Sequence, residues 1–69
     1  MITVKVNGKK ENVKEGFTVQ AVLDKKEVKT EMVAVELNGT LLTKDEFKKR
    51  VLSKGDILEF LYYMAGGFN

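Results

Sequence analysis

The stretch that decides the fold is GDILEFLYYMAGG, residues 55–67. Its first two residues, Gly55-Asp56, complete a predicted turn over Ser53–Asp56. The β-prone run from Ile57 to Met64 that follows is the longest in the chain. The run contains a single charged residue, Glu59, and we expect it to form a central strand. Its two faces are expected to carry Leu58, Phe60, Tyr62 and Met64 on one side and Ile57, Leu61 and Tyr63 on the other.

The N-terminal segment predicts a β-hairpin. Apolar and polar residues alternate up to Val6, with the period of a half-buried strand over Met1–Val6. Asn7-Gly8 follows at once and suits the positive φ angles of a type I′ turn. The return strand is expected over Lys9–Glu15, at an edge of the sheet, because Val13 is its only apolar residue.

A second hairpin is predicted in the middle of the chain. Five of the six residues in Met32–Leu37 are apolar, which predicts a strand buried on most of both faces. Asn38-Gly39 then supplies a turn of the same type, leading to a short strand over Thr40–Leu42. Val4–Gly8 weakly resembles Val35–Gly39, which indicates either two similar halves or the independent use of a common turn.

Two helices are expected between and after these hairpins. Thr18 can cap a helix over Val19–Lys26, with Phe17 and Val22 placed to form a hydrophobic staple. One stripe of that helix is apolar, formed by Val19, Val22 and Leu23. A second, short helix through about Arg50 is predicted by a capping box formed by Thr43 and Glu46.

The resulting order is β-β-α-β-β-(short α)-β. The first and last strands are both apolar enough to be central, and pairing them in parallel gives a mixed five-stranded sheet with the main helix across one face. This is an α+β fold of the β-grasp type. We expect the β-grasp domain to span residues 1–64 and a flexible C-terminal tail with Gly-Gly to span residues 65–69.

The composition indicates one small domain that lacks the common catalytic side chains. Its 69 residues, 43% hydrophobic and 32% charged, suffice for a single thin core. The chain has no Cys and no His, which excludes disulfides, thiol nucleophiles, Cys/His zinc sites and His-dependent triads. The net charge of +2 is scattered, and no apolar run approaches the roughly 20 residues of a membrane span. We expect a cytoplasmic protein that binds neither nucleic acid nor membrane.

The most distinctive chemical feature is Gly66-Gly67, directly behind the last predicted strand. Two glycines without side chains can thread a narrow channel and present a carboxylate to another enzyme. Glycines near a terminus more often mark only a frayed chain end. The pair therefore supports a function only together with the domain before it. In the functional interpretation the tail is the substrate and not the catalyst.

The sequence resembles the ThiS-type sulfur carriers, small ubiquitin-like proteins that end in Gly-Gly. Nearly the whole chain takes part in the resemblance. Its most specific part is Gly55–Phe60 running on to Ala65-Gly66-Gly67. The other matching pieces are Val6-Asn7-Gly8, Phe17-Thr18-Val19 with Val22-Leu23, and Val33–Gly39.

The resemblance implies a β-grasp fold and a role as a protein co-substrate, not as an enzyme. In such proteins a ubiquitin-activating-like adenylyltransferase adenylates the terminal glycine carboxylate with ATP, and sulfur then replaces AMP to give a thiocarboxylate. The thiocarboxylate donates sulfur to a biosynthetic enzyme, such as the thiazole synthase of thiamin biosynthesis. Gly67 would carry the reacting carboxyl and Gly66 would give clearance beside it, with no catalytic side chain, metal or cofactor implied in this chain.

Two departures from the family pattern affect these implications. Family members often carry Pro-Arg and an aromatic residue after the fourth strand, whereas this chain has Thr43–Glu46 followed by Phe47, so only the aromatic residue is retained. Phe68 and Asn69 follow Gly67 and turn its carboxyl into an amide that cannot be adenylated. Related carriers with such extensions need a protease, typically a zinc metalloprotease, and we interpret Phe68-Asn69 as a removable tail.

Two other classes of function stay open from the sequence. One is a non-catalytic β-grasp module that binds a partner through its sheet, and the other is a ubiquitin-like modifier joined to lysines through Gly67. The clusters Lys25-Lys26 and Lys48–Arg50 are typical of solvated helix faces. An exposed apolar patch on the last strand would suit a docking partner.

Overall fold

Five strands, two α-helices and one short 3-10 helix follow each other along the described part of the chain. The computed structural model describes residues 1–62, so the predictions for Tyr63, Met64 and the 65–69 tail lie outside the described residues. The elements are β1 (Ile2–Val6), β2 (Lys9–Val13), α1 (Val19–Lys25), the 3-10 helix η1 (Thr30–Met32), β3 (Val33–Leu37), β4 (Thr40–Leu41), α2 (Lys44–Phe47) and β5 (Ile57–Tyr62).

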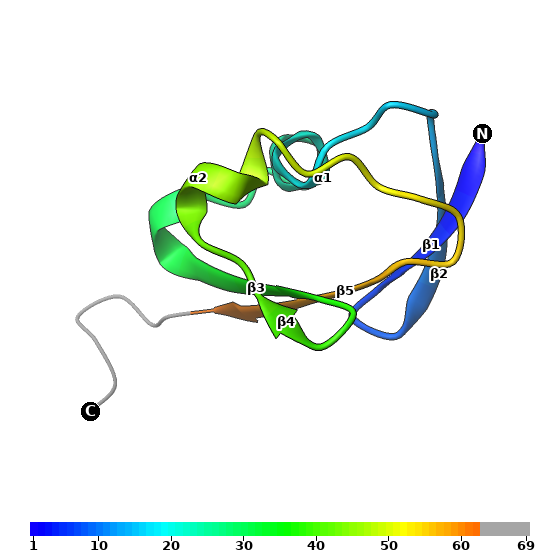
Figure 1. The fold of residues 1–69 in the computed structure, drawn as a ribbon. Coiled ribbons are helices and arrows are strands. Elements are labelled where there is room, and N and C mark those ends of the chain that lie inside the picture. Colours follow the sequence, from blue (N-terminus) through cyan, green and yellow to red (C-terminus); the bar gives the residue numbers. More distant parts are fainter. Residues whose placement is uncertain (63–69) are drawn as a thin grey trace.

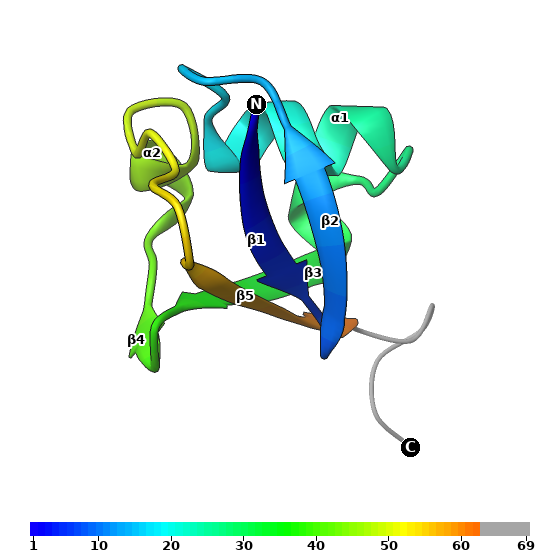
Figure 2. The ribbon, with the colours of Figure 1, turned by 90° about the vertical axis from the view of Figure 1, so that its right-hand side faces the viewer.

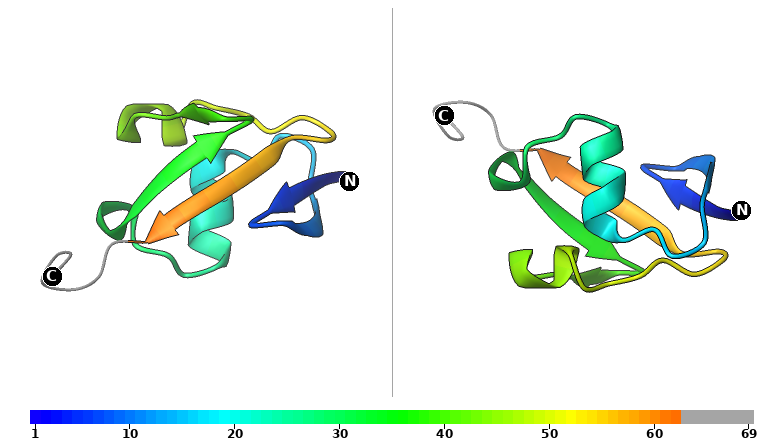
Figure 3. Two further views of the ribbon diagram at one scale, coloured as in Figure 1. Left: turned by 90° about the horizontal axis from the view of Figure 1, so that it is seen from below. Right: turned by 90° about the horizontal axis from the view of Figure 1, so that it is seen from above.

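The five strands form one mixed sheet in the order β2-β1-β5-β3-β4. β5 pairs in parallel with β1 and antiparallel with β3, so the last strand is central and β2 lies at an edge. α1 and α2 lie on the same side of the sheet (Figure 1, Figure 2). Seen from below, β5 and β3 lie in front and α1 crosses behind them (Figure 3). The predicted mixed five-stranded β-grasp sheet is confirmed.

Both Asn-Gly hairpin turns have the predicted geometry. Asn7 and Gly8 have φ angles of 50° and 83°, and Asn38 and Gly39 have φ angles of 52° and 85°. Two consecutive positive φ angles define the type I′ turn, whose twist matches that of the flanking strands. These turns fix the register of β1 with β2 and of β3 with β4.

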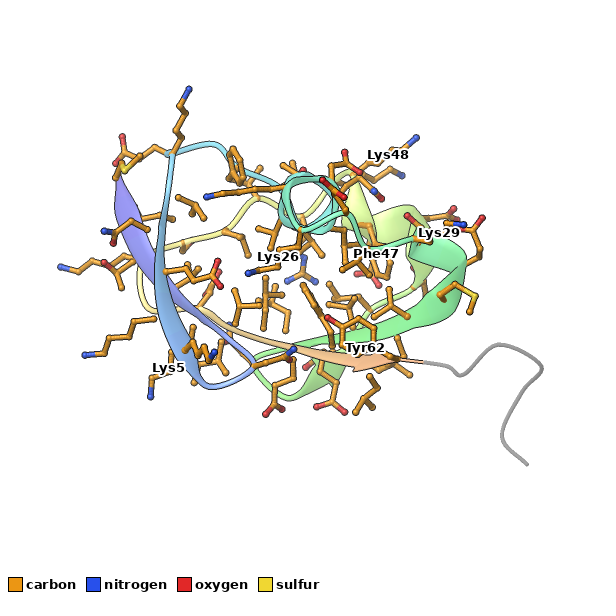
Figure 4. The ribbon with its side chains drawn as sticks, turned by 180° about the vertical axis from the view of Figure 1, so that it is seen from behind. Lys5, Lys26, Lys29, Phe47, Lys48 and Tyr62 are labelled. Atoms are coloured by element: carbon orange, nitrogen blue, oxygen red, sulfur yellow. The ribbon has the colours of Figure 1, made fainter. Side chains whose placement is uncertain are left out.

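The core lies between α1, α2 and the inner face of the sheet. The Thr18 hydroxyl accepts a hydrogen bond from the Ala21 amide at 3.1 Å, which caps α1 as predicted. The predicted apolar stripe of α1 is fully buried, and Phe47 of α2 points into the same layer (Figure 4). The largest fully buried side chains are Phe47, Leu23, Leu58, Val4, Val13, Val19, Val22, Val33 and Val35.

β3 differs from its prediction on one side. Its inner residues are buried, but Ala34 and Glu36 on the outer side are half-buried, because both helices lie on the inner side of the sheet. Burial of most of both faces was therefore a wrong prediction. Met32 belongs to η1 and not to the strand, since its amide donates to the Lys29 carbonyl at 3.0 Å.

α2 is shorter than predicted, ending at Phe47 and not near Arg50. The amides of Lys49 and Arg50 both donate to the Glu46 carbonyl, which closes the helix. The Arg50 carbonyl then accepts from the Val19 amide at 3.0 Å, so the chain leaves the helix to pair beside the start of α1. Tertiary pairing therefore ends the helix where local propensity alone would have continued it.

Candidate functional site

The predicted site residues Gly66 and Gly67, and the predicted processed residues Phe68 and Asn69, lie outside the described residues. The structure does describe β5, the strand that precedes them in the sequence. Its last residue, Tyr62, comes four positions before Gly66.

The turn before β5 aligns this strand with β1. Gly55 adopts a φ of 85°, and its amide donates to the Thr3 carbonyl at 2.8 Å. The Asp56 carboxylate accepts from the Ser53 amide at 2.7 Å, and its carbonyl accepts from the Lys5 amide at 2.9 Å. The Gly-Asp pair therefore shapes the turn and starts the parallel ladder, as expected of turn residues.

The two hairpin asparagines hold β5 from opposite sides. Asn38 exchanges two hydrogen bonds with the Ile57 backbone. Its side-chain Oδ1 accepts from the Ile57 amide at 2.9 Å, and its backbone amide donates to the Ile57 carbonyl at 2.8 Å. Its Nδ2 also donates to Asp56 Oδ1 at 3.0 Å. On the other side, the Asn7 amide donates to the Leu58 carbonyl at 2.9 Å, and Asn7 Oδ1 accepts from the Phe60 amide at 2.7 Å.

These asparagines were predicted only as turn residues. Asn7 sits where β1 turns away, so its side chain takes the place of the next strand residue opposite Phe60. The weak resemblance between Val4–Gly8 and Val35–Gly39 was the one sequence signal of this shared role. Both copies place a side-chain oxygen against the backbone of the strand that leads to the Gly-Gly tail.

The outer face of the sheet exposes large apolar side chains. Leu41, Leu61 and Ile57 are 63%, 57% and 44% exposed, and they come from β4 and β5. Within residues 1–62 no helix lies over this face (Figure 1). A shallow depression of about 320 Å³ opens on it, lined by Asn7, Glu36, Glu59, Phe60 and Leu61. The expectation of an exposed apolar patch on the last strand is confirmed for Ile57 and Leu61.

Lys44 lies in the segment where this chain departs from the Pro-Arg pattern of the family. Its Nζ donates to the Thr30 carbonyl at 2.7 Å and to the Val33 carbonyl at 3.2 Å, and lies 5.7 Å from the centre of the Phe47 ring. The ammonium group therefore ties the start of α2 to the junction of η1 and β3. A second depression, of about 280 Å³, adjoins it and is lined by Val33, Ala34, Leu41, Leu42, Thr43, Lys44 and Phe47.

Glu46, Arg50 and Lys26, on or next to the two helices, each have a partner within the fold. Glu46 accepts from the Thr43 amide at 2.9 Å, and this hydrogen bond is the main cause of a lowered pKa for the Glu46 carboxyl. Arg50 forms an ion pair with Glu46 at 3.3 Å, and Lys26 pairs with Glu11 of β2.

No group of three or more metal-ligating side chains gathers within the described part of the chain. In that same part, no helix is long and apolar enough to cross a membrane.

Comparison with known proteins identifies the family. The model of the ThiS family matches residues 3–67. The chain belongs to the ThiS family. The match covers both hairpins, both helices, the central strand and Gly66-Gly67, and it ends two residues before Asn69.

Solved ThiS structures have the same fold. The chain is similar to the crystal structure of the thiamine biosynthesis protein ThiS from Geobacter metallireducens, with 39% identity and a TM-score of 0.81 over 96% of this chain and all of that one. A solution structure of the thiamine biosynthesis protein from the same organism gives 38% identity and a TM-score of 0.77, over 99% of this chain and 91% of that one.

Curated relatives fall into two kinds. The uncharacterized protein ycf40 of Pyropia yezoensis is 33% identical over 96% of this chain and 93% of its own length. A thiazole synthase of Paramagnetospirillum magneticum is 32% identical over 90% of this chain, which spans only 19% of that longer protein. A ThiS-like segment therefore forms part of a chain named thiazole synthase.

Proposed function

We propose that the chain is a sulfur carrier of thiamin biosynthesis whose reacting group is the Gly67 carboxyl. Family membership over residues 3–67 carries this proposal, because the matched region ends on the second glycine of the tail. Fold agreement with ThiS structures and the central position of β5 support it. A cytoplasmic location is part of this proposal, because the activation step uses ATP.

The chemistry requires a free carboxylate at Gly67. Proteolysis of the bond between Gly67 and Phe68, for which a metalloprotease is suited, releases Phe68-Asn69 and frees that carboxylate. A carboxylate oxygen of Gly67 then attacks the α-phosphate of ATP on an adenylyltransferase, which forms an acyl adenylate and releases pyrophosphate. A sulfur nucleophile replaces AMP at the carbonyl carbon, and the product is the Gly67 thiocarboxylate.

The carrier acts as a co-substrate and contributes no catalytic side chain. The sequence contains neither His nor Cys, and the two tail glycines have no side chain that could act as acid, base or nucleophile. The contribution of the chain is to bind its partners and to hold the tail at the end of β5. We propose that the sulfur acceptor is a thiazole synthase, which the ThiS-like segment within a thiazole synthase chain supports.

The deciding experiment compares the full-length chain with chains ending at Gly67 and at Gly66. Each is incubated with the adenylyltransferase of the same genome, ATP, Mg²⁺ and a sulfur source, and followed by intact-mass spectrometry. We expect adenylation and thiocarboxylate formation only for the chain ending at Gly67. The full-length chain should react only after a protease removes Phe68-Asn69.

Other outcomes would assign the chain differently. Activation of the full-length chain at Asn69 would contradict processing. An isopeptide adduct to lysines would indicate a ubiquitin-like modifier. No reaction of the chain ending at Gly67, with an adenylyltransferase shown to be active, would contradict the carrier function and favour a non-catalytic interaction module.

A further inference from the structure

The two hairpin turns carry the same reactive dipeptide in the same conformation. The asparagines of Asn7-Gly8 and Asn38-Gly39 have φ angles of 50° and 52°, and both are exposed. In an Asn-Gly pair the backbone nitrogen of the glycine can attack the asparagine Cγ, because glycine has no side chain to hinder the approach. The two sites therefore form a comparison in which the dipeptide and the turn type are the same.

The reaction open to both pairs is spontaneous deamidation. The glycine nitrogen loses its proton to the solvent and forms a bond to the asparagine Cγ, and the Cγ–Nδ2 bond breaks, so that ammonia leaves and a cyclic succinimide remains. Water then adds to either ring carbonyl and opens the ring. The product is aspartate, or isoaspartate with the main chain running through the former side chain. The whole sequence consumes water, releases ammonia and needs neither an oxidant nor a cofactor.

The two asparagines differ in how the departing nitrogen is held. Asn7 Oδ1 accepts from the Phe60 amide at 2.7 Å, and its Nδ2 donates no hydrogen bond within residues 1–62. Asn38 Oδ1 likewise accepts from the Ile57 amide at 2.9 Å. Its Nδ2 also donates to Asp56 Oδ1 at 3.0 Å. Because the side chain must turn toward the glycine nitrogen to react, Asn38 has to give up a bond to a carboxylate that Asn7 does not make.

The charges near the two sites act in the same direction. The reaction passes through an anionic nitrogen and a negatively charged tetrahedral carbon, so a nearby cation speeds it and a nearby anion slows it. Lys9 directly follows the first Asn-Gly pair, whereas the Asp56 carboxylate lies against the amide group of the second. Glu36 and Glu59 line the depression beside Asn7, but neither is a hydrogen-bond partner of its side chain within the described residues. This depression of about 320 Å³ also gives water, the second reactant, access to the site.

We propose that Asn7 is a site of spontaneous deamidation in the folded chain, and that Asp56 protects Asn38 from the same reaction. The product matters because Asn7 Oδ1 takes the place of a strand residue opposite Phe60. Aspartate at position 7 keeps an acceptor there. Isoaspartate adds a methylene to the main chain of a two-residue turn and moves that acceptor, so it loosens the hold on β5. The inference does not depend on the proposed function.

Peptide mapping of the 69-residue chain tests the proposal. The chain is incubated at neutral pH with and without urea, and trypsin then separates the two sites into the peptides 6–9 and 30–44. In the folded chain the rate at Asn7 should exceed that at Asn38 about threefold or more, since Asn38 has the additional charge-assisted hydrogen bond. In urea the two rates should agree within about twofold, because unfolding removes the Asp56 contact.

The Asp56→Ala chain tests the protecting contact directly. Its Asn38 should deamidate about threefold or more faster relative to Asn7, which serves as the reference within the same chain. A general loosening of the fold would raise both rates and leave their ratio unchanged. Asp45→Ala removes the same charge from an exposed position of α2 and should leave the ratio within about twofold of its original value. If Asp56→Ala does not fold, the comparison with and without urea still decides.

The products supply a further readout. Protein isoaspartyl methyltransferase should label the peptide 6–9 of the folded chain, and the isoaspartate form, separated by ion exchange, should have a Tm lower by about 3 °C or more. Equal rates at the two sites of the folded chain, or a faster rate at Asn38, would overturn the inference. An unchanged ratio in a folded Asp56→Ala chain would overturn the role of Asp56, and an unchanged Tm would overturn the effect on β5.

Discussion

The inner and outer faces of the sheet are built by the same five strands but obey different rules. On the inner face β5 presents Leu58 and Phe60, both buried under α1 and α2. On the outer face the same strand presents Ile57, Glu59 and Leu61, all exposed. Burial constrains the inner residues to be apolar and closely packed. The outer residues are free of that constraint, and a charged residue stands there between two apolar ones.

The largest expected effect comes from comparing the two faces of β5 through the same substitution, leucine to alanine, at one position on each face. Leu58→Ala should lower the free energy of unfolding by about 3 kcal/mol, because it leaves a cavity under the helices. Leu61→Ala removes the same atoms from the exposed face and should cost less than about 0.5 kcal/mol. Urea denaturation followed by circular dichroism measures both. Equal losses in the two variants would mean that the outer face is packed in solution.

A smaller effect is expected at Asn7, which holds the strand that both faces share. Asn7→Ala removes the acceptor of the Phe60 amide and places alanine at a φ of 50°, and should cost about 2 kcal/mol. Asn7→Gly loses the acceptor without backbone strain and should cost about 1 kcal/mol. The same denaturation experiment separates the two contributions. Identical losses would show that the hydrogen bond, and not the turn conformation, sets the cost.

The smallest expected effect has the opposite sign. Glu59→Lys places a cation opposite Glu36 and should raise the free energy of unfolding by about 0.5 kcal/mol at low salt, since it replaces a repulsion with an attraction. Because both groups are exposed, the gain should shrink as salt screens them. A destabilised Glu59→Lys chain would show that the Glu36–Glu59 pair serves the fold.

The fold could be predicted because its signals are local. Asn-Gly at two positions dictates two turns, Thr18 marks the start of α1, and the apolar run after Asp56 marks the central strand. Each of these signals lies within a few residues of the element that it defines. The order of elements then leaves few arrangements of the sheet, and the β-grasp arrangement is the one observed.

The missed features depend on residues far apart in the sequence. The Asn7 side chain meets Phe60 across 53 positions, and no local pattern reports that contact. The outer side of β3 looked buried because an apolar sequence cannot say which face the helices cover. The like-charge pairs, Lys5 with Lys10 and Glu36 with Glu59, emerge only when the register aligns residues from different strands. Gly66 and Gly67 were proposed from family resemblance, and their role stays a prediction.

The parallel pairing of β1 with β5 has a consequence for the biosynthesis of the chain. The strand that must lie between β1 and β3 is the last of the five to be synthesised, so the two hairpins made earlier cannot join into one sheet while the ribosome is still translating the middle of the gene. Until residues 57–62 emerge, the apolar sides of both hairpins stay open to chaperones and proteases. A chain that ends before residue 57 should therefore be degraded. It should not fold into a carrier without a tail that competes with the full chain for its partners.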